Sequence, residues 1–328
     1  MNHFLNRQGF LSLCYHYLRP IKTLEPFPKI LGLTLDEFEN QVKMLQKNYQ
    51  IISLNDVVNF TQKNFNFSKT GMLFTFDDGL SDHYEAAKIL SKFNINGVFY
   101  IPTCIFDNEP ANPNIIHYCL ANYGINGFIS EYIIVMKKFG ILSEDLFLSF
   151  NKKIDNPWIT IEKIKKIFKY KLDYIQSRKV LLTIYKNTLL KDFPNIMEII
   201  HLTKEKTQKM IEMGHYVGVH THTHISVAPS TLTSKEFEKE LILPKKILEE
   251  TFSTNVDSLS YPFGEKQDCL SSSELLNKTK LYKIAFTVNT ILNTDKTHPL
   301  NLGRYQPLST DNYDQLKQIL DKIVENTE

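Results

Sequence analysis

The sequence predicts an α/β fold, namely a distorted or incomplete (β/α) barrel with a mainly helical insertion. Continuous apolar runs alternate with a helical pattern, as in residues 71–76, 82–93 and 96–101. This order of strand, helix and strand is typical of a βαβ unit in a parallel sheet. Too few strands are visible for a regular eightfold closure, so we expect the barrel to be incomplete or distorted.

Capping signals and apolar spacing predict the first elements in chain order. Residues 9–18 form an apolar run that we expect to be a buried strand. Thr34 and Glu37 form a capping-box pattern that predicts the start of an amphipathic helix. A short strand is expected near residues 49–54, followed by a helix that opens at Ser53.

The βα rhythm returns after residue 202. A helix is expected from Thr203 to Gly214, whose glycine suits a helix end, and Thr233 with Glu236 predicts another helix start. Pro244 is expected to kink or shorten that helix. The remaining predictions are strands at 215–220, 256–261 and 283–288 and a closing amphipathic helix at 316–324.

Residues 102–202 interrupt this rhythm with aromatic and lysine-rich helical patterns. We interpret them as a mainly helical insertion within a single catalytic domain that spans residues 1–328. Loops and insertions at a barrel rim commonly carry specificity, so we expect this segment to influence substrate choice.

Composition bounds the class of protein. The chain has 328 residues, a net charge of +2 and 23% charged residues, which is ordinary for a globular protein and gives no reason to expect a nucleic-acid partner. Its four cysteines lie far apart, which favours reduced thiols. No signal-peptide pattern or membrane span is visible, so we predict a cytoplasmic location. The oligomeric state cannot be predicted from the sequence.

Three segments at expected strand ends carry chemistry, namely FTFDDG (74–79), HTHTH (220–224) and SYPFG (260–264). In parallel βα architectures, the carboxyl ends of the strands surround one mouth. Asp77 and Asp78 follow the run at 71–76, and adjacent side chains there point in opposite directions, so one carboxylate can bind a cation while the other remains a free base. The alternative is that Asp-Asp-Gly is only a turn.

The segment VGVHTHTHIS, residues 217–226, carries His220, His222 and His224. On a regular strand all three lie on one face, whereas a bend would bring a different subset together. Two imidazoles and one carboxylate are typical of catalytic zinc. The alternative is a histidine-rich loop that binds metal adventitiously.

The motifs TFDDG (75–79), His-Thr-x-x-His (220–224) and YPFG (261–264), with the earlier Tyr15-His16 and the late Arg304, together resemble the polysaccharide deacetylase family of metal-dependent carbohydrate esterases. The resemblance implies a distorted barrel and a divalent metal, with zinc expected. It implies that Asp77 is the general base and that Asp78, His220 and His224 bind the metal. It also implies that the backbone amide of Phe263 helps to form an oxyanion hole.

The sequence departs from the family pattern at two places. Ser260 stands where many members have an arginine that orients the base. The late Leu-x-x-His segment that supplies a general acid is not found, and His16 and His298 are only weak candidates for that role. Arg304 either binds substrate, orients a site carboxylate or forms an ordinary ion pair. His222 has no assigned role.

Our leading hypothesis is a hydrolase that removes an acetyl group from an N-acetylated sugar or polysaccharide, with surface polysaccharide or lipopolysaccharide biosynthesis as the suggested pathway. One alternative is a non-catalytic relative that binds metal or glycan. Another is a related hydrolase that acts on a formyl or ester group. Asp77 separates the first alternative from the leading hypothesis, because a binding protein has no need of a free carboxylate beside a metal ligand.

Overall fold

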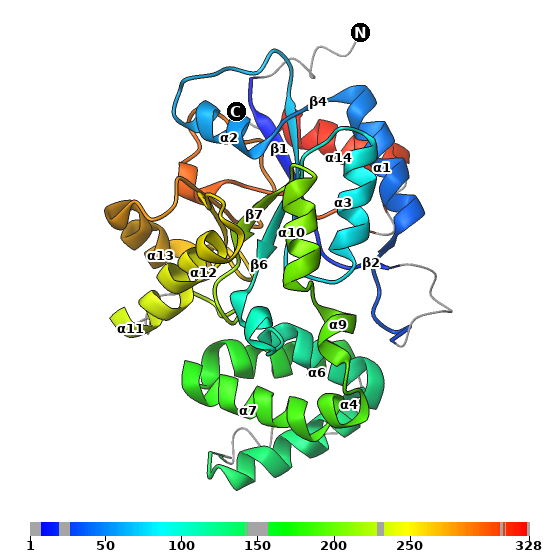
Figure 1. Ribbon diagram of the computed structural model, residues 1–328, viewed down its shortest axis with the longest axis vertical. Helices are drawn as coiled ribbons and strands as arrows, with labels where there is room; N and C mark the ends of the chain where they lie inside the picture. The colour runs from blue at the N-terminus through cyan, green and yellow to red at the C-terminus, as the bar shows by residue number, and fades with distance from the viewer. Residues whose placement is uncertain are drawn as a thin grey trace.

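The computed structural model describes residues 8–19, 27–141, 143, 157–227, 233–308, 311 and 313–326, without the side chains of residues 157, 270–275 and 313. Within these ranges, one parallel sheet forms the centre of the molecule (Figure 1). Its strands are β1 (Phe10–Tyr15), β4 (Gln50–Ile51), β5 (Gly71–Phe76), β6 (Val98–Ile101), β7 (Tyr216–Val219), β8 (Ser258–Ser260) and β9 (Ile284–Phe286).

The strands follow the order β1-β5-β6-β7-β8-β9, and β4 also pairs with β5. The register of β1 on β5 runs from Phe10 opposite Gly71 to Tyr15 opposite Phe76. All six residues of β5 are buried, as expected for a strand of a parallel sheet that is covered on both faces. The strand predicted at 71–76 is therefore confirmed residue for residue.

An irregular segment joins the two edges of the sheet. Leu302 forms an isolated bridge with Phe286 of β9, and Tyr305 forms one with Leu13 of β1. Hydrogen bonds from Cys14 N to Tyr305 O, at 2.8 Å, and from Tyr305 N to Ser12 O, at 2.8 Å, support the second bridge. Six strands thus follow one another around the barrel, and single bridges close it between β9 and β1, which confirms the predicted distorted barrel.

Helices cover the outside of this sheet (Figure 1). The N-caps are Thr34, Ser53, Thr203 and Thr233, and the capping boxes predicted at Thr34 and Thr233 are both present. The helices are α1 (Leu35–Asn48), α2 (Leu54–Thr61), α3 (His83–Lys92), α10 (Lys204–Glu212), α13 (Lys266–Thr279) and α14 (Tyr313–Glu325). A small parallel pair, β2 (Leu18–Arg19) with β3 (Leu33–Thr34), precedes α1.

The helix that begins after Thr233 is divided into three parts. Helix α11 (Ser234–Phe237) leads into the π-helix η5 (Glu238–Ile242), and α12 (Leu243–Phe252) follows with Pro244 in its first turn. Proline lacks a backbone N–H and crowds the preceding turn, so a wider turn before it relieves both constraints. The expected disturbance at Pro244 is thus a π-helical turn, and that turn buries Glu240 completely.

Residues between β6 and α10 form helices that build most of a second hydrophobic core, to which Phe27, Ile30 and Leu80 also contribute. They are the 3-10 helix η3 (Thr103–Asp107), α4 (Asn112–Lys138), α6 (Pro157–Lys166), the π-helix η4 (Ile167–Lys171), α7 (Tyr174–Asn187), α8 (Leu189–Asp192) and α9 (Ile196–Ile200). Figure 1 shows this helical segment at the end of the sheet toward which β6 points. It therefore stands over the carboxyl ends of the strands.

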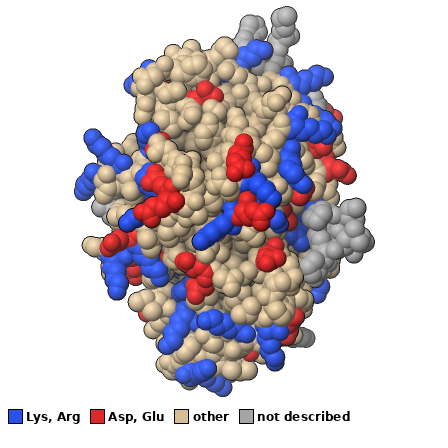
Figure 2. Space-filling model, viewed as in Figure 1, with Lys and Arg blue, Asp and Glu red and all other residues tan. Residues whose placement is uncertain are grey.

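The surface carries charges of both signs. On the face shown in Figure 2, lysine and arginine side chains are interspersed with aspartate and glutamate. None of the helices in the described ranges is long and apolar enough to cross a bilayer.

A buried histidine makes the stability of this fold depend on pH. His83 is fully buried against the stacked rings of Phe76 and Phe99, and its Nε2 lies 3.0 Å from the carbonyl of His16. Burial lowers the pKa of His83 from 6.5 to about 4. As the pH falls from 6.5 toward about 4, His83 of the unfolded chain therefore becomes protonated, whereas His83 of the folded chain stays neutral.

We expect His83 to reduce the free energy of unfolding by about 2 kcal/mol between pH 7 and pH 5. His83→Gln keeps a donor for the His16 carbonyl and removes the titration, so its unfolding free energy should change less over that interval. Denaturant unfolding at several pH values measures the difference. His298→Gln, at an exposed site, is the control. A His83→Gln variant with the pH dependence of the parent would contradict the interpretation.

Candidate active site

The carboxyl ends of three strands bring the predicted residues together. Asp77 and Asp78 follow β5, the histidine segment follows β7, and residues 261–264 follow β8. The backbone turns sharply at these ends, with positive φ values of 79° at Asp78, 60° at Thr221, 61° at His224 and 63° at Phe263. Such angles are uncommon for residues with a side chain and cluster at functional sites.

Asp78, His220 and His224 meet in one buried group. Oδ1 of Asp78 lies 3.1 Å from Nε2 of His224 and 3.4 Å from Nε2 of His220. One ligand atom from each residue lies within 4.8 Å of the others. Apart from these imidazoles, Asp78 Oδ1 has no hydrogen-bond partner among the described residues. A buried carboxylate oxygen without another partner, facing two imidazole nitrogens, fits a divalent cation.

Hydrogen bonds and burial set the state of these ligands. Burial alone would raise the pKa of Asp78, but the neighbouring imidazoles of His224 and His220 hold it well below its usual range. Burial lowers the pKa of His224, which favours the neutral imidazole. Nδ1 of His220 lies 2.8 Å from the carbonyl of Ser260. When Nδ1 donates its hydrogen to that carbonyl, Nε2 carries no hydrogen and can bind a cation.

Asp77 is held by a buried arginine. Arg304 donates from Nη1 to Asp77 Oδ1 at 2.8 Å and from Nη2 to Oδ2 at 2.7 Å, and the Ser260 hydroxyl donates to Oδ2 at 2.9 Å. Burial alone would raise the pKa of Asp77, but the Arg304 guanidinium holds it below its usual range. Of the three roles considered for Arg304, the structure shows the orientation of a site carboxylate.

Ser260 takes part in the same contact. The side chain of Arg304 is only 1% exposed and also donates to Ser260 Oγ at 2.8 Å. Its backbone lies between the two bridges that close the barrel, at Leu302 and Tyr305. The guanidinium that holds Asp77 thus comes from the closing segment, and Ser260 completes the contact with Asp77.

His222 lies apart from the other two histidines of its segment. Its Nδ1 is 2.9 Å from Thr103 Oγ1 on η3, and its Nε2 is 3.9 Å from Asp107 Oδ2. Strand β7 ends at Val219, and the positive φ of Thr221 breaks the alternation that would have placed three histidines on one face.

The two candidates for a general acid lie in different places. His16 is half-buried on the wall of the cavity that contains Asp78. His298 is exposed, and its Nδ1 accepts a hydrogen bond from Leu300 N at 3.2 Å, which caps the short helix η6 (Pro299–Asn301). The structure therefore brings His16, and not His298, to the site.

Cys14, His16 and Asp77 form a second group with metal-binding atoms close together. This group is poorly suited to a cation, because Arg304 engages both oxygens of Asp77. Burial also raises the pKa of the Cys14 thiol, which disfavours the thiolate that a metal requires. Cys14 instead donates to Asp77 Oδ2 at 3.5 Å.

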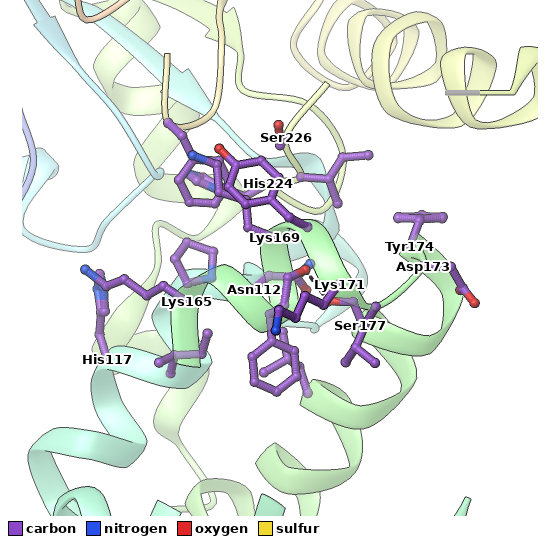
Figure 3. Close-up of a pocket in the computed structure, with 18 of the residues that line it drawn as sticks. Asn112, His117, Lys165, Lys169, Lys171, Asp173, Tyr174, Ser177, His224 and Ser226 are labelled. Carbon is purple, nitrogen blue, oxygen red and sulfur yellow. Dashed lines mark hydrogen bonds between the residues drawn. The ribbon is translucent and has the colours of Figure 1, made fainter. Parts of the chain in front are cut away.

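A cavity of about 570 Å³ lies between the group of Asp78, His220 and His224 and the helical segment. Figure 3 shows that α4, α6, η4 and α7 supply much of its wall. Asp78, His224 and Phe263 line it on the barrel side, while Asp77 is buried and is not among the lining residues. The lining residues from the helical segment include Asn112, His117, Lys165, Lys169, Lys171, Asp173, Tyr174 and Ser177.

Two buried carboxylates that were not predicted connect this wall to the site. Glu240 accepts from the backbone N–H groups of His222 and Thr223, both at 2.9 Å, and from Tyr174 Oη at 2.7 Å. Both carboxylates, Glu240 and Asp268, are fully buried. Each lies in a helical pattern that is typical of a solvated charged face, so no spacing signal in the sequence identified it.

Asp268 likewise connects the helical segment to the histidine segment, at Ser226. It accepts from Lys169 Nζ at 2.7 Å, from Tyr170 Oη at 3.1 Å and from Ser226 Oγ at 2.5 Å. The ammonium of Lys169 also lies 4.1 Å from the centre of the Phe263 ring. The π-helix η4 is therefore fixed against both the histidine segment and the segment that carries Phe263.

Comparison with known families supports the resemblance. Residues 153–283 match the family model for polysaccharide deacetylase. The matched segment includes His220, His224 and Phe263, whereas Asp77 and Asp78 precede it. A comparison with curated protein sequences finds no significant match.

Solved structures share the fold along nearly the whole chain. The Streptococcus pyogenes deacetylase PplD in complex with acetate superposes with a TM-score of 0.59 at 16% identity, over 95% of this chain and 98% of its own. IcaB from Ammonifex degensii gives a TM-score of 0.57 at 16% identity, over 96% and 98%. A de-N-acetylase from Aggregatibacter actinomycetemcomitans gives 0.56 at 12% identity, over 96% and 100%. The distorted barrel and the resemblance of this chain to the polysaccharide deacetylase family are therefore both confirmed.

Proposed function

We propose that this chain is a metal-dependent hydrolase that removes the acetyl group from an N-acetylated sugar. The observation that carries the proposal is the buried group of Asp78, His220 and His224, beside a separately held carboxylate, Asp77, at one end of a 570 Å³ cavity. The polysaccharide deacetylase match over residues 153–283 supports the same reaction class.

In this proposal Asp78, His220 and His224 hold a divalent ion, most simply zinc. Such an ion polarises an acyl carbonyl and favours the ionisation of water at neutral pH. The protein's part is to keep the ligands oriented. The Ser260 carbonyl fixes the His220 ring, and Glu240 fixes the backbone between the two histidines.

Asp77 is proposed as the general base, which takes the proton from the attacking water. Arg304 keeps Asp77 ionised and fixes the plane of its carboxylate. The same guanidinium weakens the basicity of Asp77, so the base must act through its position more than through its proton affinity. The two aspartates then have separate roles, as their opposite directions on the chain predict.

Phe263 is proposed to stabilise the developing oxyanion with its backbone N–H. The residue lines the cavity, and no described residue accepts a hydrogen bond from that N–H. Its positive φ turns the amide away from regular strand pairing. One preorganised donor of this kind contributes about 10²–10³-fold in rate.

The leaving amine needs a proton, and His16 on the cavity wall is the proposed source.

A formyl or ester hydrolase would use every residue named above, so only a panel of substrates separates it from the deacetylase. The cytoplasmic location and a role in surface polysaccharide or lipopolysaccharide biosynthesis belong to this proposal, and cell fractionation checks the first.

Asp77→Asn tests the base without changing its size. We expect the variant to release acetate from N-acetylated sugars about 10²–10⁴-fold more slowly than the parent, because an amide cannot accept the proton. Its metal content, measured by mass spectrometry, should match that of the parent. Full activity in Asp77→Asn would contradict the assignment. Loaded metal without acetate release by the parent across a broad panel would contradict the proposed function.

A comparison of His220→Ala with His222→Ala tests the ligand assignment. We expect His220→Ala to lose bound metal, since it removes one of three ligands, and His222→Ala to keep it, since His222 contacts Thr103. Equilibrium zinc titration of both purified variants measures this. If His222→Ala lost metal as fully as His220→Ala, the assignment would be wrong.

Glu240→Gln tests whether the buried carboxylate positions the ligands. The N–H groups of His222 and Thr223 both donate to Oε2, and the neutral amide oxygen that would replace this carboxylate oxygen is a weaker acceptor. We expect the affinity for zinc to fall by about 10–100-fold, as for other groups that orient ligands. Glu238→Gln, an exposed change on the same π-helix, is the control and should bind zinc as the parent does. Equal affinities in all three proteins would refute the role of Glu240.

A further inference from the structure

Helix α4 brings a histidine to the cavity that has no role in the mechanism above. His117 lines the same cavity as Asp78 and His224 (Figure 3). Its Nδ1 lies 3.1 Å from the hydroxyl of Tyr17, and Asn114 donates from Nδ2 to that hydroxyl at 3.0 Å. The three side chains form a short hydrogen-bonded relay between the barrel and the helical segment.

The relay determines which ring nitrogen of His117 carries the proton. A phenol has one proton, and because its oxygen accepts from Asn114, that proton is directed to His117 Nδ1. Nδ1 is then an acceptor, and the neutral imidazole carries its hydrogen on Nε2. The side chain of Asn114 is fully buried, with its Nδ2 toward the Tyr17 hydroxyl, while its Oδ1 has no hydrogen-bond partner among the described residues.

The surroundings of His117 favour this neutral form. Burial lowers the pKa of His117 to about 4, and the nearby ammonium of Lys165 acts in the same direction. The ring is therefore a hydrogen-bond donor at neutral pH rather than an acid. No described residue accepts a hydrogen bond from Nε2, and the residue lies on the cavity wall.

We propose that His117 binds the substrate, donating from Nε2–H to an oxygen of the N-acylated sugar in the cavity. The identity of the ligand rests on the proposed function, whereas the tautomer of His117 rests on its own hydrogen bonds. It gives the helical segment a direct part in substrate recognition. Tyr17 and Asn114 act through His117 and are positioning residues.

The tautomer is testable by nitrogen NMR of the full chain labelled with ¹⁵N-histidine. We expect His117 in the parent to be protonated at Nε2 and bare at Nδ1 at neutral pH. Tyr17→Phe removes the donor to Nδ1, so both tautomers should be populated. Asn114→Asp places an acceptor behind Tyr17, so the phenol proton should turn away and the His117 proton should move to Nδ1. A parent ring that is protonated at Nδ1 would overturn the relay.

The contact with substrate is tested by kinetics and by binding. We expect His117→Phe to raise KM by about tenfold with a smaller change in kcat, as for the loss of one hydrogen bond. His117→Gln, which keeps a donor, should recover part of the loss, and Tyr17→Phe should show a weaker effect of the same kind. Tyr185→Phe, which removes a buried hydroxyl from the same helical core without touching the relay, is the control.

Titration of the labelled parent with N-acetylglucosamine separates this inference from the proposed function. We expect the Nε2–H signal of His117 to move as the sugar binds. A moving signal in a protein that releases no acetate would refute the deacetylase and keep the contact. An unmoved signal together with an unchanged KM in His117→Phe would refute the contact and keep the deacetylase.

Discussion

The buried ion pair between Arg304 and Asp77 is the constraint on which the rest of the site depends. A carboxylate that is 2% exposed must be paired, because an isolated buried charge is strongly destabilising. Removing one partner of such a pair costs about 3–5 kcal/mol. Arg304 lies on the irregular segment that forms bridges with both edge strands, β9 and β1. The contacts that close the barrel therefore also position the guanidinium that orients the proposed base.

Buried carboxylates likewise connect the helical segment to the segment that carries His220 and His224. Glu240 connects Tyr174 of α7 with the backbone at His222, and Asp268 connects Lys169 of η4 with Ser226. Both carboxylates are fully buried and hydrogen-bonded, so the helical segment is fixed to the site by charges that cannot be released without large cost. This segment therefore forms part of the site rather than a cover over it.

The sequence predicted the features that local chemistry decides. The strand at 71–76 and the capping box at Thr34 follow from residues adjacent in the chain, and the structure confirms both. Features that depend on distant contacts were not predictable. The closing segment around Arg304 has no strand periodicity, because it forms only single bridges. The burial of Glu240 depends on a π-helical turn before Pro244, which shifts one residue from the expected exposed face to the interior.

The histidines illustrate what a sequence pattern leaves open. A pattern shows where an imidazole stands, but its chemistry depends on what the second nitrogen meets in the fold. His220 meets the Ser260 carbonyl and so presents Nε2 to Asp78, whereas His222, two residues later, meets Thr103 and faces away. His117 meets a phenol that itself accepts from Asn114, and so presents a hydrogen to the cavity. The roles proposed for these three identical side chains, as ligand, structural contact and donor, thus differ because distant parts of the chain supply their partners.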